Sequence, residues 1–209
     1  MHLVFIVVLS GLASIDGDTT ELLAERSGPI ISNPVTVEYF CILVRSEEVD
    51  GEYGQALEFF PPGNAGPPEY YHPTYEERFE VLEGEYVFIV DGERRTLTAG
   101  NELTVPPGTP YTYRHESDSL ATSLGEARPP AQIEEVVKTM FGLAHKGKVG
   151  ENGDPTFLHL MTMVPELADD TVFTSPPPIL QKALATVLAP IARLAGHQAI
   201  YPKYLDDSF

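Results

Sequence analysis

A succession of short strand-like segments between residues 35 and 126 limits what this chain can fold into. The segments are rich in Val, Ile, Phe, Tyr and Thr, and Gly, Pro or Asp-Gly residues separate them; they read VTVEYFCILV, QALEFF, RFEVLE, EYVFIVD, ERRTLT, ELTV, YTYRH and LATSLGE. Asp91 and Gly92 predict a tight hairpin, because a two-residue type I′ turn needs positive φ at both central positions. Many short strands at this spacing are typical of a β-sandwich or barrel, so we expect a mainly β fold here.

The pattern changes to helical spacing after residue 126. The segment AQIEEVVKTMFGLAHKG carries apolar residues on one helical face and ends at Gly147. PTFLHLMTMVPELA is a shorter helical candidate, and SPPPILQKALATVLAPIARLAGH is a third, in which Pro190 should kink the helix and Gly196 end it. Such stripes usually serve core packing, so we expect these helices to pack on the outside of the strands.

Charge excludes two classes of partner. The chain has 31 acidic and 13 basic residues, a net charge of −18, and no basic cluster. Nucleic acids and anionic membrane surfaces are bound through clustered Lys and Arg, so neither is expected as a partner. The single cysteine, Cys41, lies in an apolar run and is expected in the core.

The N-terminal sequence LVFIVVLSGLA is apolar but too short to span a bilayer. Only Met1 and His2 precede it, without the Lys or Arg of a typical secretory signal. We expect an uncleaved segment that packs on the body or on a partner chain, and hence a cytoplasmic protein, although the signal-like pattern leaves secretion open.

A specific spacing begins at Tyr70. One residue separates it from His72, four more lead to Glu77, and six more lead to Gly84. This arrangement resembles the first motif of the cupin superfamily, Gly-x5-His-x-His-x3–4-Glu-x6-Gly, with tyrosine in place of the first histidine. The opening glycine of the motif would fall on Asn64.

A second spacing follows after residues 85–99. Gly100, five residues, Pro106, one residue, Gly108, two residues and Tyr111 resemble the second cupin motif, Gly-x5-Pro-x-Gly-x2-His-x3-Asn. Tyrosine again replaces the histidine, and His115 takes the place of the asparagine.

The resemblance implies a single RmlC-like jelly-roll β-barrel over residues 30–126, with a pocket inside one mouth. Residues 1–29 would form an N-terminal apolar segment and arm. Residues 127–209 would form a C-terminal helical extension, because the tail resembles the C-terminal helices of small single-domain cupins. Small cupins pair through sheet edges, and the apolar residues 2–13 could cover one, so we expect a homodimer.

In the family, the two histidines and the glutamate of the first motif and the histidine of the second bind a divalent metal. This chain keeps His72 and Glu77, but a tyrosine at positions 70 and 111 must lose a proton with a pKa near 10 before it can ligate well. We therefore expect no metal cofactor. The alternative is Fe or another divalent transition metal held by His72, Glu77 and either a tyrosine or His115.

Side chains two apart on a strand share a face, so the motif residues should converge inside the barrel. We expect four catalytic residues there: Tyr70, His72, Glu77 and Tyr111. We expect three substrate-binding residues beside them: Phe79, Tyr113 and His115. Structural roles remain open, since His72 and Glu77 could be a buried pair, the tyrosines core aromatics, and His115 a brace for a turn.

These residues leave three functions open. The first is a metal-independent isomerase, cyclase or lyase, for example a Diels–Alderase, that acts on a small hydrophobic intermediate of specialised metabolism. The second is a metal-dependent cupin dioxygenase or other oxygenase. The third is a cupin that binds a ligand without catalysis.

Overall fold

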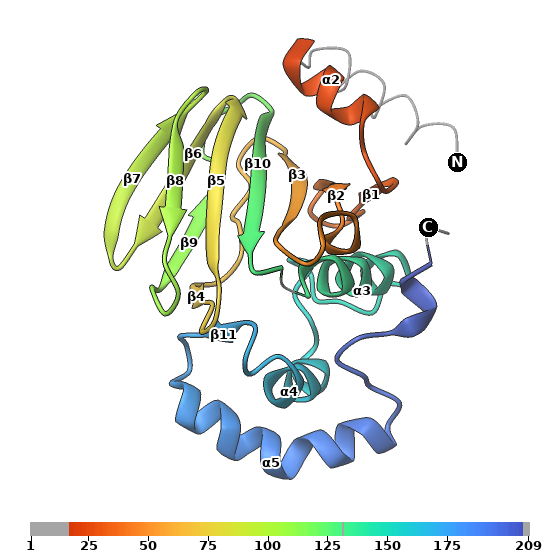
Figure 1. The fold of residues 1–209 in the computed structure, drawn as a ribbon. Coiled ribbons are helices and arrows are strands. Elements are labelled where there is room, and N and C mark those ends of the chain that lie inside the picture. The colour runs from red at the N-terminus through yellow and green to blue at the C-terminus, as the bar shows by residue number, and fades with distance from the viewer. Residues whose placement is uncertain (1–16, 131, 207–209) are drawn as a thin grey trace.

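The structure, a computed structural model, describes residues 17–130 and 132–206 (Figure 1). The apolar segment at residues 2–13 lies outside the described residues, so its expected packing is not addressed. The described residues contain no helix of the length and apolar character that a membrane crossing needs.

Two antiparallel sheets form the β-rich part. The first has six strands in the order β1 (Ile30–Ser32), β2 (Tyr39–Val44), β3 (Gly54–Phe60), β10 (Ala121–Arg128), β5 (Glu76–Glu83) and β8 (Glu102–Val105). The second has five, in the order β11 (Val172–Phe173), β4 (Tyr70–Tyr71), β9 (Tyr111–Arg114), β6 (Glu85–Val90) and β7 (Glu93–Thr98). The expected mainly β jelly roll is confirmed, but over the described residues no strand ladder closes the two sheets into a barrel.

The predicted hairpin is also confirmed. β6 pairs with β7 through Val90 and Glu93, and Asp91 and Gly92 between them have φ values of 51° and 78°. Positive φ at both positions is what the type I′ turn requires.

The main core lies between the two sheets, because its side chains come from strands of both. They are Phe60, Tyr70, Phe79, Val81, Tyr86, Phe88, Val90, Leu103, Val105, Tyr111, Tyr113 and Ala121. On the outer face of the first sheet, Cys41, Leu43, Leu57 and Phe59 form a second cluster, on which Leu22 and Leu23 of α2 (Gly17–Ala24) pack. Cys41 is thus a core residue, as expected.

The tail contains α3 (Ile133–His145), α4 (Phe157–Glu166) and α5 (Pro178–Leu194), with short 3-10 turns at Ser46–Val49 and Pro202–Tyr204. α5 continues through Pro190. α4 and α5 pack on each other at one end of the molecule (Figure 1).

The expectation that all three helices cover the outside is wrong for α3. Its Phe141 packs on Phe40, Ile42 and Ala56, which the strand register places on the inner face of the first sheet. The second sheet leaves this part of the inner face open, and α3 covers it.

The tail also supplies a strand that the sequence pattern did not reveal. β11 pairs with β4 through Val172–Tyr71 and Phe173–Tyr70. It adds an edge strand to the second sheet and brings the residues just before it, Asp170 and Thr171, beside His72.

Candidate active site

Strand pairing brings the motif residues of the second sheet together. Tyr70 of β4 lies opposite Tyr111 of β9, and their ring centroids are 4.6 Å apart. The loop after β8 packs beside this pair, because the Gly108 amide donates a hydrogen bond to the carbonyl of His72, which follows β4, at 2.7 Å. Gly108 has a φ of 76°, a conformation that favours glycine.

Glu77 reaches this group from β5 in the first sheet. Its Oε2 lies 3.1 Å from His72 Nε2 and accepts a hydrogen bond from the Tyr111 hydroxyl. The Tyr111 hydroxyl also lies 2.9 Å from His72 Nε2. All three side chains are buried. The predicted convergence of His72, Glu77, Tyr70 and Tyr111 is therefore confirmed as geometry.

The far side of the His72 ring is held by the tail. His72 Nδ1 lies 2.9 Å from the Asp170 carbonyl, which can only accept, so Nδ1 carries a proton and donates it. Tyr75 stacks on the imidazole at 4.1 Å between centroids, and its hydroxyl donates to Asp170 Oδ1 at 3.1 Å. The orientation of His72 is thus fixed, with Nε2 directed at Glu77 and Tyr111.

Burial and charge set the protonation of these groups. Burial lowers the pKa of His72, but the hydrogen bond and negative charge of Glu77, with further help from Asp170, raise the pKa above its ordinary 6.5. Burial first, and then the charge of Glu77, raise the pKa of both Tyr70 and Tyr111 well above 10. At neutral pH both phenols are neutral.

A cavity of about 460 Å³ lies on the inner face of the first sheet, beside α3. Three buried carboxyl groups line it: Glu77 on β5, Glu58 on β3 and Glu126 on β10, of which Glu126 is paired with Arg128. Its apolar lining includes Phe40, Ile42, Ala56, Ala127 and Ile133.

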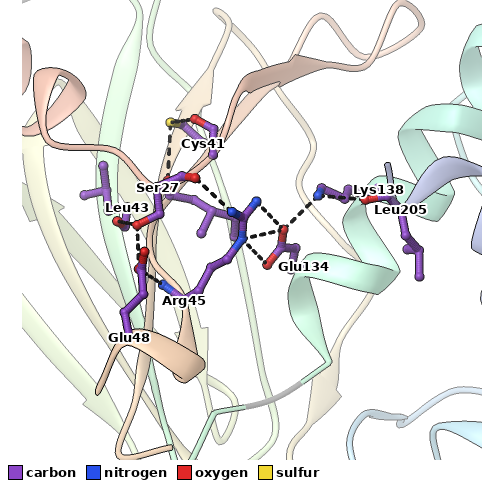
Figure 2. A network of polar contacts seen from close by, with 10 residues as sticks. Ser27, Cys41, Leu43, Arg45, Glu48, Glu134, Lys138 and Leu205 are labelled. Carbon is purple, nitrogen blue, oxygen red and sulfur yellow. Dashed lines mark hydrogen bonds and ion pairs between the residues drawn. The ribbon is translucent and has the colours of Figure 1, made fainter. Parts of the chain in front are cut away.

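A polar network stands on the α3 side of the cavity (Figure 2). Glu134 Oε1 lies 3.1 Å from Arg45 Nη2 and 2.8 Å from Lys138 Nζ. Lys138 Nζ also donates to the Leu205 carbonyl at 3.1 Å. The two cations among these lining residues therefore already share a carboxylate.

Glu58 is a site residue that our reading of the sequence missed. Only 8% of the residue is exposed, and the Tyr113 hydroxyl donates to its Oε2 at 3.1 Å. Burial, together with the charge of Glu77, raises its pKa to about 8 against the lowering effect of the Tyr113 hydrogen bond. A signal was present, because the alternation in QALEFF puts Ala56, Glu58 and Phe60 on the same buried face.

None of the three residues predicted to bind substrate lines this cavity. Phe79 is a core residue, 5.2 Å from the Tyr113 ring between centroids. Tyr113 donates a hydrogen bond to Glu58, which lines the cavity. His115 is bonded to the backbone carbonyls of Glu85 and Ser119, so it braces the end of β9.

The residues present do not fit the divalent metal of the family. His72 Nε2 and Glu77 are only two conventional donors, and the phenols beside them are held neutral. Both ring nitrogens of His115 face backbone carbonyls. In the described part of the chain, no group of three or more His, Cys, Asp or Glu is placed to hold a metal.

Residues 56–124 match the family model of the cupin domain, in agreement with the two sheets and the motif spacing. Residues 56–124 therefore form a cupin domain. Over 50 residues the chain is 38% identical to quercetin 2,3-dioxygenase of Bacillus subtilis (strain 168), a match that covers 24% of this chain and 15% of that enzyme.

Solved structures are similar over about half of the chain. One described as a predicted oxalate decarboxylase from Thermotoga maritima is 20% identical, with a TM-score of 0.45, over 51% of this chain and 95% of that one. An RmlC-like cupin from Shewanella frigidimarina NCIMB 400 is 21% identical, with a TM-score of 0.41, over 49% and 85%. At these scores and coverages, neither the dioxygenase nor the structures carry an argument about the reaction.

Proposed function

We propose that this chain is a metal-independent enzyme that moves a proton within a small, mostly apolar molecule, and that its reaction is an isomerisation. The observation that carries the proposal is the buried contact of Glu77 with His72 and Tyr111 at the wall of the cavity. Positioned carboxylate–histidine pairs are common general acid–base groups.

Each member of this group has a part in the transfer. Glu77 is the member that lines the cavity, so it takes the proton from a substrate carbon. His72 Nε2, 3.1 Å away, lies within hydrogen-bond distance of the Glu77 carboxyl group and keeps it oriented toward the cavity. Tyr111, a neutral donor, holds the carboxylate in place, and the Asp170 carbonyl holds His72.

The cavity fits a small organic substrate. Its volume of about 460 Å³ lies within the roughly 300 to 1,000 Å³ that is usual for small-molecule sites. Its apolar residues can contact a cyclic or branched hydrocarbon frame, and its polar residues can contact a carbonyl group.

The test uses 3-cyclohexen-1-one, whose isomerisation to 2-cyclohexen-1-one moves one proton and is followed by ultraviolet absorbance. Glu77→Gln should lower the rate about 100-fold or more, the usual contribution of a general base. Glu76→Gln, on the same strand but exposed, is the matched control and should retain the wild-type rate. A wild-type rate no higher than that of Glu77→Gln would overturn the proposal and favour a binding protein.

A further inference from the structure

Glu58 and Glu77 lie on opposite sides of a floor of small residues. In the strand register, Glu58 of β3 is level with Ser123 of β10, and Glu77 of β5 is level with Ala127 of β10. Gly125 lies between Ser123 and Ala127 on the same face and pairs with Ala56. Because Ala56, Gly125 and Ala127 all line the cavity, there is room for a ligand between the two carboxyl groups.

The surroundings of Glu58 make it a hydrogen-bond donor at neutral pH. Its pKa of about 8 keeps the carboxyl protonated, and a protonated carboxyl has an O–H to offer. The titratable groups that act on it come from several elements: Glu77 of β5, Glu38 before β2, and Tyr113 of β9. Tyr86 of β6 and Tyr70 of β4 also interact electrostatically with Glu58. Burial raises the pKa of each phenol well above 10, so both stay neutral.

The charge of the cavity argues for a neutral substrate. Besides Glu58 and Glu77, its described lining includes Glu47, Glu126, Glu134, Glu135 and Asp206. The cationic residues among the described lining are Arg45 and Lys138, and both are paired with Glu134. A substrate carboxylate would meet like charges in a confined space.

We propose that Glu58 donates a hydrogen bond to the carbonyl oxygen of a neutral β,γ-unsaturated ketone while Glu77 moves its proton. This inference rests on the proposed function and names its substrate class. Glu77 takes the proton from the α-carbon, the C–H electron pair spreads over the dienolate, and negative charge develops on the oxygen that faces Glu58. The proton then returns from Glu77 to the γ-carbon, so that atoms and electrons balance without an oxidant or reductant. Glu58 keeps its own proton throughout, as a neutral acid does in an oxyanion hole.

Kinetics with 3-cyclohexen-1-one test the role of Glu58. Glu58→Leu should lower kcat about 100-fold and change KM far less, because the donor matters most in the transition state. Glu58→Gln should lose less, since its amide still donates. The wild-type rate should fall above about pH 8 as Glu58 ionises, and this fall should be absent in Glu58→Gln.

Tyr113→Phe separates this role from a structural one. The hydrogen bond from Tyr113 lowers the pKa of Glu58, so its loss should raise that pKa. The alkaline fall in rate should then move to higher pH. Infrared difference spectra between wild type and Glu58→Gln at pH 7 should contain the C=O band of a protonated carboxyl group. This measurement does not depend on catalytic turnover. An alkaline fall that persists in Glu58→Gln, or the absence of that band, would overturn the inference. If Glu77→Gln is inactive while Glu58→Leu is fully active, the inference fails and the proposed function stands.

Discussion

Glu58 should make the folded protein less stable as the pH rises, and the size of the effect follows from its pKa. The pKa of the Glu58 carboxyl group is 4.5 in the unfolded chain and about 8 in the folded state. Between pH 4.5 and pH 8, therefore, the proton is bound in the folded state and lost in the unfolded state. Stability therefore falls as pH rises through this window. At about 1.4 kcal/mol per pH unit, the total loss is up to about 5 kcal/mol, complete above pH 8.

The measurement is urea unfolding of wild type and Glu58→Gln at several pH values between 5 and 9. The glutamine is uncharged and can still accept from Tyr113, so the difference between the two proteins isolates the titration of Glu58. The wild type should lose stability relative to Glu58→Gln between pH 5 and 8, and the difference should then level off. The exposed control Glu76→Gln should show no such trend. A difference between wild type and Glu58→Gln that does not depend on pH would show that Glu58 does not hold a proton in the folded state across this range.

Three further predictions concern other parts of the molecule. Glu77→Gln should lower the pKa of His72, since Glu77 supplies the main raising effects; NMR titration of the imidazole measures this, and an unchanged pKa would contradict the contact. Gly142→Ala should destabilise the fold by about 1 to 3 kcal/mol in urea, because its Cβ would come within 2.4 Å of the Tyr204 ring, and full stability would show that this ring does not pack on α3. We expect a homodimer, so light scattering at micromolar concentration should give twice the chain mass, and the monomer mass would contradict this expectation.

Much of the β-rich part could be predicted because its signals are local. Alternating side chains and turn residues define the strands, and the Asp91-Gly92 turn sets the pairing of β6 with β7. The convergence of His72, Glu77 and Tyr111 follows from the motif spacing, since the resemblance specifies which strands face each other.

The remaining features depend on contacts between distant segments. Asp170 reaches His72 from 98 residues away, through a two-residue strand with no pattern of its own. The position of α3 depends on which part of the inner face the second sheet leaves open, which an apolar stripe does not specify. Glu58 was detectable in principle, but a single carboxylate in an apolar strand does not reveal its partner Tyr113, 55 residues away.

Proton transfer at Glu77 without a metal can be tested directly. Its most direct test is the rate of 3-cyclohexen-1-one isomerisation before and after exhaustive dialysis against a chelator, with the metal content of each sample measured by mass spectrometry. Both samples should give the same rate, and the rate of the dialysed sample should still depend on Glu77. A rate that disappears on dialysis and returns with a stoichiometric divalent transition metal would contradict this prediction.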